Sequence, residues 1–220
     1  MSKRRLLLLP LLLLASPAVA DSLLTIRSSI EGLKMDQPPP GEIRIWIGGD
    51  KLRREEGDTS YILRLDRGKL YVLNHAEKTY TELAVADLQQ LASPGAELKV
   101  QVTATNETKK IGNWNARKYK VDLSNPGLHL DTTIWASRDI ASYEAYGRLA
   151  ASLAALQPGG AEWARKMEQI EGFPVLQEAD VKMGNSRFRT REELVAVETR
   201  DAPADAYELP AGYTARPFPQ

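Results

Sequence analysis

The sequence predicts an α+β protein in which a strongly curved antiparallel β-sheet, an incomplete barrel, has two or three helices covering its concave face. Three observations lead to this fold class. Most of the chain after residue 20 alternates between apolar and polar side chains with a period of two, as half-buried strands do. Turn-forming Gly, Asn and Pro residues separate the alternating segments. Helical spacing occurs in only a few segments, and the longest lies late in the chain.

The first twenty residues have the pattern of a secretory signal peptide. A basic head, Lys3 to Arg5, precedes an apolar run over 6–14, and Ala18-Val19-Ala20 supplies the small residues that signal peptidase recognises. The run is too short to cross a bilayer. We expect cleavage after Ala20 and a periplasmic protein. Because residue 21 is Asp and not Cys, we expect no lipid anchor.

The length of the remaining chain, 21–220, suits one domain, or one domain with a small appendage, and the chain ends in a Pro-rich tail. Removing residues 1–20 leaves 26 basic and 29 acidic residues, a net charge of −3. This weakly acidic balance gives no basic surface for a nucleic acid. The chain has no cysteine, which excludes thiol chemistry. No second apolar segment approaches the ~20 residues of a membrane span, so no integral membrane segment is expected after cleavage.

The first half of the mature chain predicts an antiparallel meander. In the strand over 43–47 the three isoleucines share one face, while Arg44 and Trp46 lie on the other. Strands over 61–66, 70–74 and 78–83 follow. A tight turn at Asp66–Lys69 joins the first two, because Gly68 tolerates the positive φ that such turns need. Residues 84–92 change to three-residue spacing and predict a short helix.

The second half predicts further strands interrupted by one helical region. Hairpins turn near Gly112-Asn113, Asn125–Gly127 and Gly184-Asn185. Between them, apolar residues at helical spacing predict a helix over 143–156 and a shorter one over 163–170.

No motif for catalysis, a metal or a cofactor is present. The two histidines, His75 and His129, lie near turn residues and outside zinc-type spacings, and we interpret both as solvated loop residues. The adjacent pairs Glu55-Glu56 and Glu192-Glu193 would point to opposite faces of a strand and so would not form a catalytic dyad. We expect no enzyme, no cofactor and no metal.

Several strands are apolar on both faces, which implies that something covers each side of the sheet. One interpretation is an apolar cavity between the sheet and the helices, which would receive an acyl chain. The other is a solid core that the helices fill with their own side chains, and the residues alone favour it. The aromatic residues that would form the wall of a cavity are Trp46, Tyr71, Trp135, Tyr146 and Trp163.

Several short sequence segments resemble the DUF4412 family of exported bacterial proteins, in the LolA/LolB/LppX-like group of lipoprotein-carrier folds. They include residues 32–35, 45–53, 66–74, 78–82, 115–121 and 209–213. The resemblance implies a curved, incomplete barrel with helices on its concave side, and it favours the cavity. It supplies no catalytic residues.

The sequence thus predicts a soluble periplasmic protein that holds a lipid or a lipoprotein acyl chain between sheet and helices. The alternative is an envelope protein-interaction or stress-sensing module with a solid core, no ligand and an envelope protein as partner. A hydrolase that uses carboxylates is the least favoured.

Overall fold

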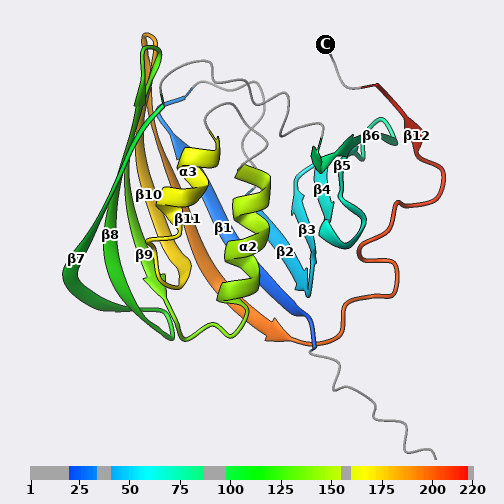
Figure 1. Ribbon diagram of the computed structural model, residues 1–220, viewed down its shortest axis with the longest axis horizontal. Coiled ribbons are helices and arrows are strands. Elements are labelled where there is room, and N and C mark those ends of the chain that lie inside the picture. Colours follow the sequence, from blue (N-terminus) through cyan, green and yellow to red (C-terminus); the bar gives the residue numbers. More distant parts are fainter. Residues whose placement is uncertain (1–19, 34–40, 87–97, 155–159, 218–220) are drawn as a thin grey trace, which may run out of the picture.

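The computed structural model describes residues 20–33, 41–86, 98–154 and 160–217. Twelve strands and two α-helices lie within these ranges (Figure 1). The strands are β1 (Ser22–Glu31), β2 (Glu42–Gly48), β3 (Lys51–Glu56), β4 (Thr59–Arg64), β5 (Lys69–Asn74), β6 (Thr79–Ala84), β7 (Lys99–Ile111), β8 (Trp114–Asn125), β9 (Leu128–Ser137), β10 (Phe173–Met183), β11 (Ser186–Thr199) and β12 (Thr214–Ala215). The helices are α2 (Tyr143–Ala154) and α3 (Gly160–Met167).

All twelve strands form one sheet in the order β12-β6-β5-β4-β3-β2-β1-β11-β10-β9-β8-β7. The strand that comes first in the chain, β1, therefore pairs with a late one, β11. This pair joins the meander of β1 to β6 to the meander of β7 to β11. Neighbouring strands are antiparallel except β12, which runs parallel to β6. The sheet is mixed, and it is not closed because β12 and β7 are its two edges.

Most of the predicted elements are confirmed. Ile43 and Ile45 lie on the same face as Leu24, and Trp46 lies on the opposite face, next to Leu23. The turn before β5 contains a short 3₁₀ turn that ends at Gly68 with φ +61°. Both late helices occur within a few residues of their predicted ranges. From residue 87 the helix expected over 84–92 lies outside the described residues.

The predicted fold class, α+β with helices covering a concave face, is wrong. The two helices have 12 and 8 residues, so they are about 18 and 12 Å long. Twelve strands spaced ~4.8 Å apart extend over about 50 Å, which two such helices cannot cover. Within the described residues, the molecule is mainly a twelve-stranded mixed sheet with two short helices, α2 and α3, on one face. The period-two pattern identified the strands but could not show how many of them share one sheet.

The two faces of the sheet pack against different parts of the chain. We call the face that carries α2 and α3 the helix face, and the opposite one the outer face (Figure 1). The largest core cluster includes Leu24, Ile45 and Leu63 together with Leu149 of α2. A second cluster lies on the outer face, where Trp46, Ile62 and other residues pack against the C-terminal segment, residues 200–217.

Candidate functional site

A half-open pocket of about 470 Å³ lies where α2, α3 and β10 meet on the helix face. Its wall is mainly apolar. The apolar residues that line it are Tyr143, Tyr146, Ala150, Ala151, Ala154, Trp163, Ala164, Met167, Ile170 and Pro174. The volume falls within the ~300–1,000 Å³ of typical small-ligand sites.

The space exists because the side of α2 that faces α3 carries small residues. Gly147, Ala150, Ala151 and Ala154 recur at helical spacing and leave room that larger side chains would fill. The α3 side supplies Trp163 and other large apolar groups. The pocket is therefore built from small residues on one helix and large ones on the other.

Tyr146 lies at the inner side of this pocket, between α2 and the sheet. Its ring packs on Phe173, with centroids 4.6 Å apart. Burial raises the pKa of Tyr146, so its hydroxyl stays protonated and uncharged. Nearby on the helix face, Arg54 is hydrogen-bonded to Glu56 at 2.9 Å and lies 3.5 Å from Glu192.

Arg54 stays charged although burial by itself would lower its pKa. The two carboxylates, Glu56 and Glu192, outweigh that penalty and raise the pKa above its ordinary value. The charge of the arginine is thus balanced by protein groups. It therefore offers little net attraction for an acidic headgroup at this place.

The five aromatic residues predicted as a cavity wall do not meet in one place. Tyr146 and Trp163 line the pocket. Trp46 and Tyr71 are buried on the outer face, in the cluster that contains Tyr207 of the C-terminal segment. Trp135 is in register with Lys118 and Leu176, and the ammonium of Lys109 lies 4.0 Å from its ring centroid.

The C-terminal segment is attached to the outer face by polar contacts as well. The buried guanidinium of Arg64 donates hydrogen bonds to Glu208 and to the carbonyl of Tyr207. Arg53 donates to the carbonyl of Ala206. Beyond these, β12 adds backbone hydrogen bonds to β6.

His75 belongs to this attachment, and its interpretation as a solvated loop residue is wrong. Its Nε2 lies 2.6 Å from the hydroxyl of Ser60, which is fully buried, and its Nδ1 lies 2.6 Å from the hydroxyl of Tyr213. The turn position of His75 in the sequence gave no signal of these partners, because both come from other parts of the chain.

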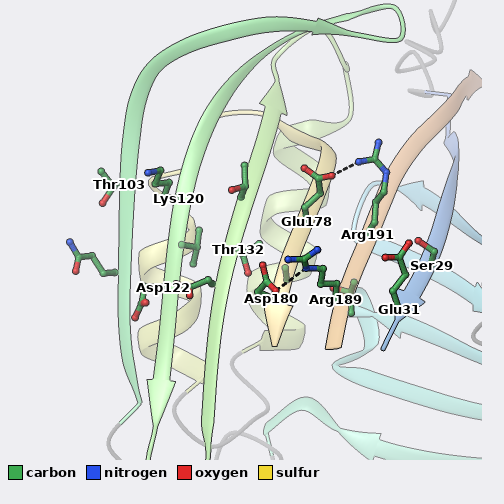
Figure 2. Close-up of a pocket in the computed structure, with 16 residues that line it drawn as sticks. Ser29, Glu31, Thr103, Lys120, Asp122, Thr132, Glu178, Asp180, Arg189 and Arg191 are labelled. Carbon is green, nitrogen blue, oxygen red and sulfur yellow. Dashed lines mark hydrogen bonds and ion pairs between the residues drawn. The ribbon is translucent and has the colours of Figure 1, made fainter. Parts of the chain in front are cut away.

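The remainder of the outer face forms a polar groove of about 920 Å³ (Figure 2). Cross-strand register gives it two rows of side chains that run over six strands. The first row is Ser29, Arg191, Glu178, Thr133, Lys120 and Thr103, and the second is Glu31, Arg189, Asp180, Asp131, Asp122 and Gln101. These rows could not be predicted from the sequence, because they appear only once the strand register is known.

The fold and the pocket define an open-sheet protein with a small apolar site on one face and a polar groove on the other. A family model described as Domain of unknown function (DUF4412) matches residues 41–213. The chain belongs to this family, and the resemblance noted in its sequence is confirmed. None of the curated proteins matches the chain.

The solved structures that match the chain include PNGF-II in two crystal forms, at 14% and 15% sequence identity and TM-scores of 0.42 and 0.44. These matches cover 90% of this chain but only 31% and 32% of the PNGF-II chains, so this chain spans about a third of their length. A DUF1329 family protein from Desulfovibrio piger ATCC 29098 matches at 12% identity and a TM-score of 0.33, over 87% of this chain and 90% of the other. Likenesses of this degree support no argument about function.

Proposed function

We propose that this protein binds an apolar ligand, the acyl chain of a lipid or lipoprotein, in the pocket between α2, α3 and β10. The observation that supports the proposal is the apolar, half-open space of about 470 Å³ left by the small residues of α2. Packed protein interiors leave few voids larger than a water molecule, so a space of this size between two helices and a strand is available to a ligand.

The physical chemistry of the wall suits an acyl chain. Each buried methylene contributes about 0.8 kcal/mol, so eight methylenes supply about 6 kcal/mol before the costs of immobilisation. No directed polar contact is needed for binding at this level. Arg54 does not line the pocket and is already balanced by Glu56 and Glu192, so the apolar wall alone supports the proposal.

We further propose that the protein acts outside the cytoplasm, after cleavage of residues 1–20. The support is the basic head, apolar run and small-residue site of that segment. No helix within the described ranges is long and apolar enough to cross a membrane. N-terminal sequencing of the protein recovered from the periplasm tests this, with Asp21 expected as the first residue.

Titration of the mature chain with 11-dansylamino-undecanoic acid tests ligand binding. The dansyl emission should rise and shift to the blue when the acyl chain enters the pocket. Ala151→Trp fills the pocket and should abolish the response. Ser152→Trp, on the same helix but outside the wall, should leave it unchanged.

Two results would contradict the proposal: no change in emission with the wild-type chain, or equal binding by Ala151→Trp. Circular dichroism of both variants verifies that they fold. The alternative, an interaction module without a ligand, predicts the first of these results.

A further inference from the structure

Two aspartates face each other directly across β8 and β9 on the outer face. Asp122 is the cross-strand partner of Asp131, so both carboxylates point to the same side of the sheet. Like charges in directly opposite positions destabilise a sheet unless something placed between them compensates for the repulsion.

The side chain between them is His129. It precedes Asp131 by two positions on β9, and residues two apart on a strand share a face. Its Nε2 lies 3.2 Å from Oδ2 of Asp131 and 3.8 Å from Oδ2 of Asp122. The donor atoms of the three side chains all lie within 4.8 Å of one another.

These distances suit a metal ion. Bonds of ~2.0–2.1 Å from zinc to nitrogen and oxygen place two ligands on the same ion about 3.0–3.5 Å apart. The imidazole–carboxylate pair already has this separation, and the other aspartate needs only a small side-chain rotation. The three groups come from two hydrogen-bonded strands, so the backbone that positions them is fixed.

The neighbouring arginines form ion pairs with other acids and not with Asp122 or Asp131. On β10 the next acid in the row, Asp180, is paired with Arg189, and Glu178 is paired with Arg191 (Figure 2). Asp180 also lies 3.6 Å from Arg187. Within the described ranges, His129 is the only basic side chain within ion-pair distance of Asp122 or Asp131. Lys120 and Lys182 lie nearby but are exposed, so their ammonium groups can extend into solvent.

We propose that Asp122, His129 and Asp131 bind one divalent transition-metal ion, with Zn²⁺ as the best match to one imidazole and two carboxylates. The remaining coordination positions face the polar groove, where water or an anionic ligand can occupy them. This site lies on the opposite face of the sheet from the apolar pocket and does not depend on it. It revises the expectation of no metal, and the spacing His129-x-Asp131 on one strand is the sequence signal for it.

Calorimetric titration of the untagged mature chain with ZnCl₂, in a buffer that does not chelate zinc, tests the proposal. We expect one ion per chain. His129→Ala and Asp131→Asn should each weaken binding at least ~10-fold. Asp180→Asn, a matched loss of charge at the neighbouring row position, should bind as the wild type does, because the carboxylate of Asp180 already belongs to two arginines. Bound zinc should also raise the melting temperature of the wild type and not that of His129→Ala.

Three results would overturn the site: no zinc binding, unchanged binding by His129→Ala, or an equal loss in Asp180→Asn. A parallel titration with CaCl₂ separates zinc from a merely acidic surface, since calcium prefers oxygen ligands. Calcium binding as tight as that of zinc, and insensitive to His129→Ala, would also count against it.

Discussion

The two halves of the outer face have opposite chemistry although they belong to one sheet. Over β2 to β5 the C-terminal segment covers the face, and the residues beneath it are apolar, among them Trp46, Ile62 and Leu73. Over β11 to β7 no described segment covers the face, and the corresponding positions form the polar rows. We call these the covered half and the open half.

The comparison explains why several strands are apolar on both faces. Trp46 and Tyr71 occupy outer-face positions that are buried, because a later part of the chain packs on them. A period-two pattern with two apolar faces therefore indicates that each face is covered, but it does not distinguish a helix, a ligand or the protein's own terminus as the cover.

The largest expected effect comes from removing an anchor of the covered half. Trp46→Ala should lower the free energy of unfolding by about 3–5 kcal/mol, because it leaves a cavity beneath the C-terminal segment. Urea denaturation measures the change. Thr103→Ala, an exposed position in the open half, should cost less than about 0.5 kcal/mol. Similar costs for the two variants would contradict the distinction between the halves.

Glu208→Gln should destabilise the protein by about 1 kcal/mol at pH 7, a modest value because Glu208 is 47% exposed. The hydrogen bond from Arg64 holds the pKa of Glu208 below its ordinary value of 4.5. A depressed carboxyl pKa stabilises the fold above the unfolded-state pKa, and this contribution is lost as pH falls through the folded-state pKa. The stability difference between wild type and variant should therefore be constant from pH 7 to about 5 and should close below about pH 4.5. A difference that grows on acidification would be inconsistent with this ion pair.

Tyr213→Phe removes the hydrogen bond to His75 and should cost about 1 kcal/mol. Tyr143→Phe is the matched control. Among the described residues, the hydroxyl of Tyr143 donates a hydrogen bond only to the exposed Glu144, so thermal unfolding of this variant should be near that of the wild type. If both variants unfold at the same temperature, the His75 contact does not attach the C-terminal segment.

Arg189→Gln, in the open half, is expected to have the smallest effect. Its ion pair with Asp180 is solvent-exposed, and such pairs contribute about 0–1 kcal/mol. A shift of the urea midpoint equivalent to less than about 0.5 kcal/mol is expected. A loss of stability as large as that of Trp46→Ala would mean that the ion pairs of the polar rows stabilise the fold as much as the buried apolar residues of the covered half do.

Local elements could be predicted well from the sequence, whereas the pairing of strands far apart in the chain could not. The faces of β2, the turn at Gly68 and the late helices follow from rules that act over a few residues. The pairing of β1 with β11 joins residues about 170 positions apart, and no local pattern specifies it. Of the candidate site, Tyr146 and Trp163 were predicted. The alanines of α2 were not, because small residues at helical spacing are usually packed core.

On this account, the ligand binds on the helix face, and the C-terminal segment alone covers Trp46 and Tyr71. The most direct test is hydrogen–deuterium exchange of the mature chain with and without saturating lauric acid. We expect slower exchange over residues 143–154 and 160–177 and unchanged exchange over 44–73 and 200–216. Slower exchange over 44–73 together with faster exchange over 200–216 would mean that the acyl chain displaces the C-terminal segment, and it would contradict the account.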